Sequence, residues 1–454
     1  MKRIFVLLLA LLICLNTTTL LAANPEPQSA TAESAVSISL PDLEAKSAAL
    51  INQDTGRILF NKNAHQKQYP ASTTKIMTAL LAMQNENLDA TITVGKEVNL
   101  APIDGSKAGL KPGQKISLRD LLRALLLPSG NDAAYTVSVY IARKVKNDQS
   151  MNISDSQDYF VVLMNNKAKE MGLKNTAFTN PHGYPDENHY TTAYDLALIA
   201  REAMQNPFFR EVVKTESYAL KTDENLNANK EANNTTVWYN RNLLIRPKSK
   251  YYFPDATGIK TGHTSVAGSC LVSSGTKHNM NLIAVVLNSS EPGRWIDSKK
   301  LLEYGFTNFQ SYQLLKKNHA VKSIRLKNQS LFDPGQLDLV PAKDFTEILR
   351  KDEVPKLLQT IAWNKELLAP SLQADGEERL LAPLYEGQPV GKVVFQVDGK
   401  TIAESDLLAA RTVKQNIISL VTSKKVIPYT IAAGLIILVV AILVFRQIIS
   451  RKKY

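Results

Sequence analysis

The order of apolar and polar residues predicts a mixed α/β body in the middle of the chain. Residues 46–60, KSAALINQDTGRILF, form two apolar runs around a turn at Asp54-Thr55-Gly56, which predicts a β-hairpin. Residues 256–289 predict antiparallel strands around glycine-rich turns. Apolar residues recur with helical spacing over 75–86, 117–126, 130–145, 191–205 and 294–308. Strands at both ends with helices between them indicate an α/β (α+β) domain over residues 44–310.

The pattern changes after about Ser311. Residues 311–412 carry short alternating strands and turns, most clearly in GQPVGKVVFQVDGKTI, where Asp398-Gly399 predicts a tight turn. We therefore expect a small all-β domain over 311–412, followed by a linker over 413–425. No internal repeat of solenoid length is present.

The N-terminal segment is typical of a secretory signal. Met1-Lys2-Arg3 precede an apolar run over residues 4–15, and Ala22-Ala23 supply small residues for cleavage. Residues 1–23 are therefore expected to be a signal peptide. Residues 24–43, rich in Ala, Ser, Pro and Glu, are expected to be a flexible lead-in.

A second apolar run predicts a transmembrane anchor over residues 426–446. About 20 apolar residues suffice to cross a bilayer, and the segment 447–454 that follows is basic. A buried core helix is the alternative. With the signal, this run predicts a cell-membrane protein with a single C-terminal span, a short cytoplasmic tail and an extracytoplasmic body.

Composition and charge narrow the classes of partner. The 454 residues are 44% hydrophobic and 21% charged, as in ordinary globular proteins. The net charge is +12, but the basic residues are scattered and no nucleic-acid motif occurs, so an anionic cell envelope is favoured over nucleic acid. If the signal segment with Cys14 is removed, Cys270 has no disulfide partner, and no cysteine-protease signature surrounds it.

Three short motifs follow one another along the chain. They are Pro70-Ala-Ser-Thr-Thr-Lys75 before a predicted helix, Pro128-Ser-Gly-Asn-Asp132 between two predicted helices, and Lys260-Thr-Gly-His-Thr264 on a predicted strand. Each motif alone is weak, because Ser274…Lys277 repeats the first spacing and Ser150…Asn152 the second. Those two copies fall at a strand end and in a polar loop, so we favour the first set.

The first motif can supply an activated nucleophile. A serine hydroxyl needs a neighbouring base, and a lysine serves only when its pKa is lowered so that it is neutral. Lys75 lies one helical turn after Ser72, and the apolar neighbours of Lys75 together with a cationic Lys260 would lower its pKa. The alternative is that Ser72 caps a helix and Lys75 lies on the surface.

The second motif offers proton-transfer and hydrogen-bonding groups. The Ser129 hydroxyl could pass a proton to a leaving amine, and the Asn131 amide both donates and accepts hydrogen bonds. The same residues could also form a turn with a helix cap at Asn131 or Asp132, and the two interpretations are compatible.

The third motif suits a substrate carboxylate. Lys260 and Thr261 supply a charge and a hydroxyl, and Gly262 leaves room for a substrate backbone along the strand. His263 is expected to act through its backbone N–H as an oxyanion donor, with its imidazole as a less favoured general base.

The chain resembles the low-molecular-weight penicillin-binding proteins, which are serine D-Ala-D-Ala carboxypeptidases. The family-like stretches occur in the family's order and cover most of residues 44–410. They are PASTTKIMTALLA, LLPSGNDAA, FTNPHGYPDENHYTTAYDLALIA, NRNLL, GIKTGHTSVAGSCLV and LLAPLYEGQPVGKVVFQVDGKTIAE. The resemblance implies a β-lactamase/transpeptidase-like catalytic domain over 44–310: an antiparallel sheet with helices on both faces and a helical subdomain, followed by the family's β domain.

The resemblance also implies a mechanism without metal or organic cofactor. The substrate would be a peptidoglycan stem peptide ending in D-Ala-D-Ala, and β-lactams would acylate the same Ser72. Lys75 would be the base, and Ser129 and Lys260 would relay a proton to the leaving D-alanine. Lys260 and Thr261 would hold the terminal carboxylate, Asn131 would position the peptide, and the N–H groups of Ser72 and His263 would hold the oxyanion. Peptidoglycan synthesis and cell shape are the processes implied.

Two other functions remain open from the sequence. A class A β-lactamase would need a carboxylate-activated water. We find no Glu-x-x-x-Asn loop that matches the one in those enzymes, and Glu187-Asn188 is a poor candidate. A non-catalytic penicillin sensor is the second, although a complete motif set argues against it.

Overall fold

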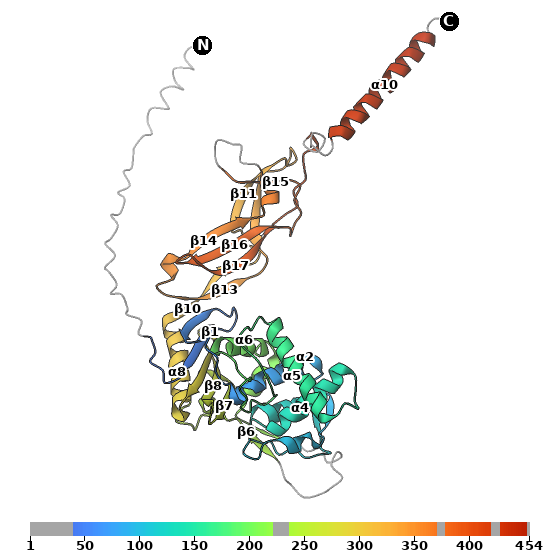
Figure 1. The fold of residues 1–454 in the computed structure, drawn as a ribbon. Helices are drawn as coiled ribbons and strands as arrows, with labels where there is room; N and C mark the ends of the chain where they lie inside the picture. Colours follow the sequence, from blue (N-terminus) through green and yellow to red (C-terminus); the bar gives the residue numbers. More distant parts are fainter. Residues whose placement is uncertain (1–39, 221–235, 370–376, 419–426, 452–454) are drawn as a thin grey trace, which may run out of the picture. The chain divides into compact units, whose positions relative to one another are not determined.

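The computed structural model describes residues 40–220, 236–369, 377–418 and 427–451 (Figure 1). The predicted signal peptide and most of the lead-in lie outside these residues. The first domain is built on a five-stranded antiparallel sheet in the order β2-β1-β9-β8-β7, with β7 at one edge. Its strands are β1 (Ser47–Asn52), β2 (Ile58–Lys62), β7 (Ala256–Thr264), β8 (Gly268–Lys277) and β9 (Met280–Ser289).

Helices cover both faces of this sheet, as expected (Figure 1). Successive residues of a strand point to opposite faces. In β9, Ile283, Val285 and Leu287 belong to a core shared with α2 (Lys75–Asn85) and α6 (Ala193–Ala203). The alternate residues of β9 face α8 (Glu291–Asn308), where Gly305 of the helix packs close to Leu282.

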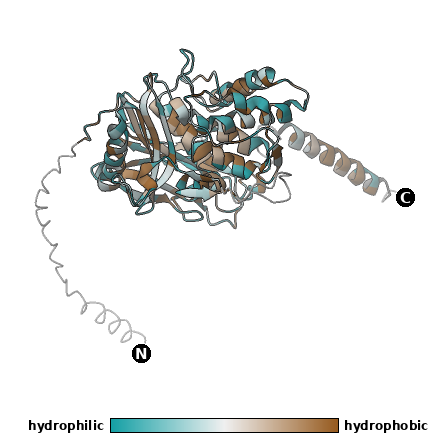
Figure 2. Cartoon of the chain, turned by 90° about the horizontal axis from the view of Figure 1, so that it is seen from below, coloured by the Kyte–Doolittle hydropathy of each residue, from teal (hydrophilic) through white to brown (hydrophobic). Residues whose placement is uncertain are grey.

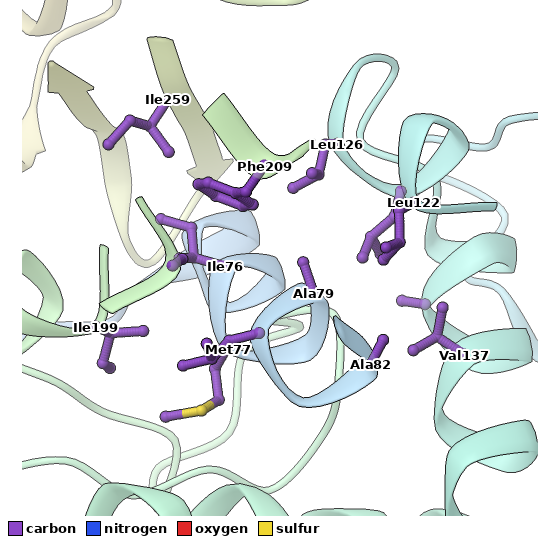
Figure 3. Packing of buried hydrophobic residues seen from close by; sticks show 14 of the residues in the cluster. Ile76, Met77, Ala79, Ala82, Leu122, Leu126, Val137, Ile199, Phe209 and Ile259 are labelled. Carbon is purple, nitrogen blue, oxygen red and sulfur yellow. The ribbon is translucent and has the colours of Figure 1, made fainter. Parts of the chain in front are cut away.

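A helical subdomain surrounds α2. Figure 3 shows Ile76, Met77, Ala79 and Ala82 of α2 packed among apolar side chains from neighbouring elements. The other helices are α3 (Leu118–Leu126), α4 (Asn131–Lys146), α5 (Ile153–Glu170) and α7 (Pro207–Lys214). Two short ladders pair β3 (Thr91–Thr93) with β4 (Lys115–Ser117) and β5 (Ser217–Ala219) with β6 (Val237–Tyr239).

The sequence pattern did not predict α5. This helix buries only Ser156, Phe160, Met164 and Ala168, one residue in four along a single narrow line. Two of these four residues are small or polar, so the apolar stripe typical of an amphipathic helix is too thin to recognise. The helix is capped by the Asn152 side chain, which accepts the Asp155 N–H at 2.9 Å.

The second domain is all β, as the alternating pattern predicted. A separate two-stranded ladder pairs β10 (Phe309–Leu315) with β13 (Phe345–Arg350), and a six-stranded sheet has the order β14-β16-β17-β12-β11-β15. These strands are β14 (Leu358–Trp363), β16 (Pro389–Val397), β17 (Lys400–Ala409), β12 (Gln336–Pro341), β11 (Lys322–Lys327) and β15 (Arg379–Leu381). The predicted turn at Asp398-Gly399 joins β16 to β17.

The last described element is helix α10 (Ile427–Arg451). Its stretch Pro428–Ile448, with a mean hydropathy of 2.6, is long and apolar enough to cross a membrane, and Figure 2 colours this helix as largely hydrophobic. It is the one helix with these properties in the part of the chain that the structure describes.

One buried carboxylate fastens the start of the first domain to α8. Asp297 is almost completely buried and accepts hydrogen bonds from the Ala45 N–H at 2.8 Å, the Glu44 N–H at 3.1 Å and the Ser289 hydroxyl at 3.1 Å. Replacing this side chain by an apolar one leaves several buried donors without an acceptor.

We therefore expect Asp297→Ala to lower the free energy of unfolding by about 2 kcal/mol or more. The measurement is denaturant-induced unfolding of the whole protein, followed by tryptophan fluorescence. Glu303→Ala is the matched control, because Glu303 lies on the same helix in an exposed ion pair with Lys299 and should cost less than about 0.5 kcal/mol. Equal losses in the two variants would contradict the assigned role of Asp297.

Candidate active site

The predicted nucleophile lies in a tightly packed turn. Ser72 belongs to the 3₁₀ turn Ala71–Thr74, which continues into α2. Ala71 adopts the left-handed φ of 49°, a conformation that costs energy for a residue with a side chain. Pro70 and Thr74 hold the N-terminal cap positions of the two helical segments, so the alternative that Ser72 is a simple helix cap is wrong.

Two glycines allow neighbouring chain segments to approach this turn. A Cβ at Gly183, whose φ is 87°, would lie 1.8 Å from the Ala71 carbonyl oxygen. A Cβ at Gly262 would lie 2.9 Å from the Pro70 oxygen and 3.1 Å from the Ser72 nitrogen. Strand β7 and the loop at Gly183 can therefore approach the backbone of residues 70–72 only because these positions lack side chains.

The amine of Lys75 makes three hydrogen-bonding contacts. Its Nζ lies 3.0 Å from Ser72 Oγ, 2.7 Å from Asn131 Oδ1 and 3.0 Å from the His182 carbonyl oxygen. Both Asn131 Oδ1 and the carbonyl can only accept. A neutral amine has two N–H bonds and one lone pair, so donating to these two oxygens directs the lone pair at the Ser72 hydroxyl. The alternative of a surface lysine is wrong, because Lys75 is completely buried.

Burial makes the neutral form of this amine accessible. Burial, together with the smaller effect of the positive charge of Arg241, lowers the pKa of Lys75 from 10.5 to about 7, although the charge of Asp132 acts in the opposite direction. The imidazole of His182 adds no charge nearby, because burial and the Lys75 charge hold its pKa well below 6.5. His182 Nδ1 accepts the Tyr184 N–H at 3.2 Å, so Nε2 carries the proton and donates to the Tyr135 hydroxyl at 2.9 Å.

The second motif brings a hydroxyl and an amide to the site. Ser129 has the left-handed φ of 66°, is nearly buried, and its Oγ has no hydrogen-bond partner in the protein. The Asn131 side chain is held by Lys75 rather than used as a cap, and the N-cap of α4 is Gly130 without a side-chain bond. A cap at Asn131 is therefore wrong, whereas Asp132 Oδ1 does accept the Ala133 N–H in the first turn of α4 at 3.0 Å.

Asp132 ties the loop over residues 101–114 to the second motif. Its buried carboxylate accepts the N–H groups of Ala108, Gly109 and Leu110 at 2.8 to 3.1 Å. The same loop is linked to the motif through Ser106. The Ser106 carbonyl accepts the Asn131 N–H at 2.8 Å, and the Ser106 hydroxyl donates to the Ser129 carbonyl at 2.8 Å.

The third motif lies on β7, at the edge of the main sheet. Lys260 is almost completely buried, and its Nζ donates to the Thr261 carbonyl at 3.0 Å. Burial lowers the pKa of Lys260 well below 10.5, and the charge of Lys75 lowers it further. His263 is exposed, and its Nδ1 lies 3.2 Å from Ser269 Oγ.

Two arginines belong to this site although the sequence motifs did not single them out. The charges of Arg241 and Arg294 both lower the pKa of Lys260, so all three cationic groups share one neighbourhood. Arg294 Nη1 donates to the Gly262 carbonyl at 3.1 Å and Nη2 pairs with Glu291 at 2.5 Å. The only sequence signal for Arg241 was its place in the family-like stretch NRNLL, and Arg294 had none.

The residues that repeat the spacing of the first two motifs, Ser274 with Lys277 and Ser150, are bound to other partners. Ser274 Oγ lies 2.7 Å from Thr257 Oγ1, and Lys277 pairs with Asp255 at 2.9 Å, so each group has a partner other than its motif counterpart. Ser150 is hydrogen-bonded to Asp148. Burial raises the pKa of the Cys270 thiol to about 11, which argues against a nucleophilic thiolate. Among the described residues no cluster of three or more His, Cys, Asp or Glu side chains could hold a metal ion.

The arrangement can therefore perform nucleophilic acyl transfer on an anionic substrate. The Ser72 hydroxyl lies 3.0 Å from a lysine amine whose pKa is lowered to about 7, and the Ser129 hydroxyl has no hydrogen-bond partner in the protein. The charges of Lys75, Arg241 and Arg294 all act on Lys260, so the site has a positive potential.

Two family models match the chain. Residues 33–291 match the peptidase family described as D-alanyl-D-alanine carboxypeptidase, and residues 309–415 match the C-terminal domain of penicillin-binding protein 5. The DacF carboxypeptidase of Bacillus subtilis is 32% identical over 377 residues, which cover 82% of this chain and 86% of that protein. The DacA carboxypeptidase of Haemophilus influenzae is 33% identical over 81% of this chain and 84% of its own.

Solved structures agree with this match. Penicillin-binding protein 5 from Haemophilus influenzae superposes with a TM-score of 0.65 at 30% identity, covering 83% of this chain and 99% of that one. A Streptomyces DD-transpeptidase superposes with a TM-score of 0.53 at 34% identity over 59% of this chain and 99% of its own. The expected transpeptidase-like fold with a β domain is confirmed, and the chain belongs to the D-alanyl-D-alanine carboxypeptidase family of serine hydrolases.

Proposed function

We propose that this enzyme removes the terminal D-alanine from peptidoglycan stem peptides through an acyl-enzyme on Ser72. The observation that carries the proposal is the buried Lys75 amine, 3.0 Å from Ser72 Oγ and with a pKa lowered to about 7. Such an amine is neutral in a large fraction of molecules at neutral pH, so it can act as the base without a histidine or a metal.

Acylation uses the first and third motifs. Lys75 removes the proton of Ser72 as Oγ attacks the carbonyl between the two D-alanine residues. The N–H groups of Ser72 and His263 hold the resulting oxyanion, a role supported by the close approach of β7 to the Ser72 nitrogen at Gly262. The edge position of β7 leaves it available to an extended peptide.

The cationic side chains select a substrate with a free carboxylate. Lys260 and the Thr261 hydroxyl hold the terminal carboxylate, and Arg241 adds long-range attraction. Burial and neighbouring positive charges lower the pKa of Lys260. A bound substrate carboxylate would place a negative charge beside it and so favour its protonated form. Asn131 positions the peptide through the amide group that does not bind Lys75.

Release of D-alanine and hydrolysis complete the cycle. The proton taken by Lys75 reaches the leaving amine through Ser129, whose buried Oγ is free to donate, with Lys260 as the neighbouring proton donor. Water then attacks the acyl-enzyme with Lys75 again as the base, which restores Ser72. A β-lactam follows the same first step but has no leaving group that departs, so its adduct persists.

We place the catalytic domain outside the cytoplasm. The support is the apolar helix Pro428–Ile448, the basic residues after it and the signal-like N-terminal segment. A single C-terminal span then tethers the enzyme to the cell membrane beside its polymeric substrate.

The test is release of D-alanine from a peptide ending in D-Ala-D-Ala by the purified protein. We expect release, slow turnover of labelled penicillin, and loss of both activity and covalent labelling in a folded Ser72→Ala variant. Intact labelling without D-alanine release would favour a penicillin sensor, and rapid penicillin turnover would favour a β-lactamase. Peptide transfer to an added amine with little hydrolysis would favour a transpeptidase.

A second prediction concerns Asp132 as a positioning residue. Asp132→Asn replaces an acceptor of four N–H groups, three from the loop and one from Ala133, by an amide. Loss of one such bond, about 1.5 kcal/mol, should slow acylation of Ser72 by penicillin roughly tenfold. Because the Asp132 charge raises the pKa of Lys75, its removal should also shift the acid limb of the acylation pH profile to lower pH.

The matched control is Asp104→Asn, which removes the same charge from an exposed position of the same loop. It should change neither the rate nor the pH profile. A slower Asp132→Asn variant whose acid limb stays in place would show that the residue acts on loop structure alone and does not tune Lys75.

A further inference from the structure

Exposed apolar side chains of the β domain gather at one end of its six-stranded sheet. Among its described residues, six large hydrophobic side chains are exposed, and Phe332 and Leu331 are 98% and 78% exposed. Five of the six lie in three segments: the loop between β11 and β12, the loop before β16, and the chain that continues after β17. They are Leu331, Phe332, Tyr385, Ile417 and Ile418.

Hydrogen bonds fasten the β11–β12 loop to the outgoing chain. The Ser330 N–H donates to the Lys414 carbonyl at 2.8 Å, and the Asn416 N–H donates to the Asn328 carbonyl at 2.8 Å. The exposed pair Leu331 and Phe332 follows directly after this contact. Their position beside residues 414–416 is therefore fixed by paired backbone.

The other side of the same outgoing segment binds the loop that carries Tyr385. Leu384 and Val413 exchange two backbone hydrogen bonds at 3.0 and 2.8 Å, and the Thr412 hydroxyl accepts the Glu386 N–H at 3.1 Å. The segment over residues 411–416 thus lies between the two loops, and all five apolar side chains belong to one end of the domain.

The sixth exposed side chain lies at the opposite end of the sheet. Leu358 pairs with Gln396, next to the Asp398-Gly399 turn, whereas the far end of β17 at Ala409 pairs with Leu339 toward the β11–β12 loop. Strand β17 runs the whole way between these ends, over Lys400–Ala409, about 30 Å at 3.3 Å per residue. Exposed apolar residues therefore concentrate at the end from which the chain leaves for α10.

The tether to the apolar helix is short. Only residues 417–427 separate Asn416 from the apolar stretch that begins at Pro428, and covalent geometry limits this connection to about 40 Å. The chain leaves Asn416 through Ile417 and Ile418, which are two of the five exposed side chains. The end of the domain that is rich in apolar side chains is thus also the end that the anchor holds near its membrane.

The chemistry of this end suits a bilayer surface. Phenylalanine and tyrosine side chains are favoured at membrane interfaces, and isoleucine and leucine gain from burial in the acyl boundary. Exposed Lys414 and half-buried Lys327 can meet anionic headgroups, while Asp333 is neutralised by Arg411 at 2.6 Å. Glu386, in the Tyr385 loop, is exposed and carries a negative charge, opposite in sign to these lysines.

We propose that this end of the β domain, the apolar tip formed by residues 328–335, 384–387 and 411–418, lies in the headgroup region of the bilayer that α10 crosses. The inference rests on the proposed membrane anchor and adds a second contact with the same membrane. Two contacts restrict the rotation of the β domain about its tether, which one helix on a short linker cannot do.

The experiment uses the whole protein in vesicles of phosphatidylethanolamine and phosphatidylglycerol. An environment-sensitive fluorophore is attached at Phe332→Cys, and quenching by nitroxide lipids is measured. We expect a blue-shifted emission and at least twofold quenching by headgroup-proximal nitroxides. Phe332 is almost fully exposed, so its replacement should leave folding intact. The wild-type chain treated with the same fluorophore serves as the control for background labelling, which should be low because Cys270 is buried.

Two further positions separate the possible failures. Leu358→Cys, an exposed leucine at the opposite end of the same sheet, should show neither effect, and Leu435→Cys within the predicted span should be quenched by deep nitroxides. Quenching at residue 435 without quenching at residue 332 would overturn the inference while leaving the anchor intact, as expected if the tip binds a protein instead. No quenching at residue 435 would show that the anchor is wrong, and the inference with it.

Discussion

The proposed chemistry of this protein depends on the contact between a buried lysine amine and two carbonyl oxygens. Asn131 Oδ1 and the His182 carbonyl each accept one N–H of Lys75, which leaves the lone pair for Ser72. The three partners come from α4, from the loop before Gly183 and from the turn before α2. Much of the first domain therefore serves to bring these segments together at a buried position. Exclusion of water there lowers the pKa of the amine to about 7.

The sequence predicted those groups of the candidate site that lie in short motifs. One helical turn separates Ser72 from Lys75, but Ser274 and Lys277 have the same spacing. The first pair was therefore singled out only together with the two later motifs, which contain Ser129, Asn131 and Lys260. The central antiparallel strands and most helices were predicted from period-two and helical patterns. The α5 helix was missed because its buried stripe is a single line of small and large residues.

Residues that contact the candidate site from distant parts of the chain could not be predicted from local sequence patterns. Arg294 reaches the Gly262 carbonyl from α8, and Asp132 holds a loop more than twenty positions earlier in the chain. His182 supplies a backbone oxygen, which any residue type could offer, so only the tertiary structure assigns it to Lys75. The gathering of Leu331 and Phe332 beside the outgoing chain likewise depends on strand order, which a local pattern does not contain.

The most direct measurement of the central claim is the pH dependence of the second-order rate constant for Ser72 acylation by penicillin, which reports the free enzyme. Only the neutral amine accepts the serine proton, so the rate should rise as the pH increases through about 7 and level off above it. A folded Lys75→Ala variant should lose this rise together with nearly all of the rate. A rate that is flat or falling between pH 5.5 and roughly 8.5, or rapid acylation of Lys75→Ala, would contradict the account.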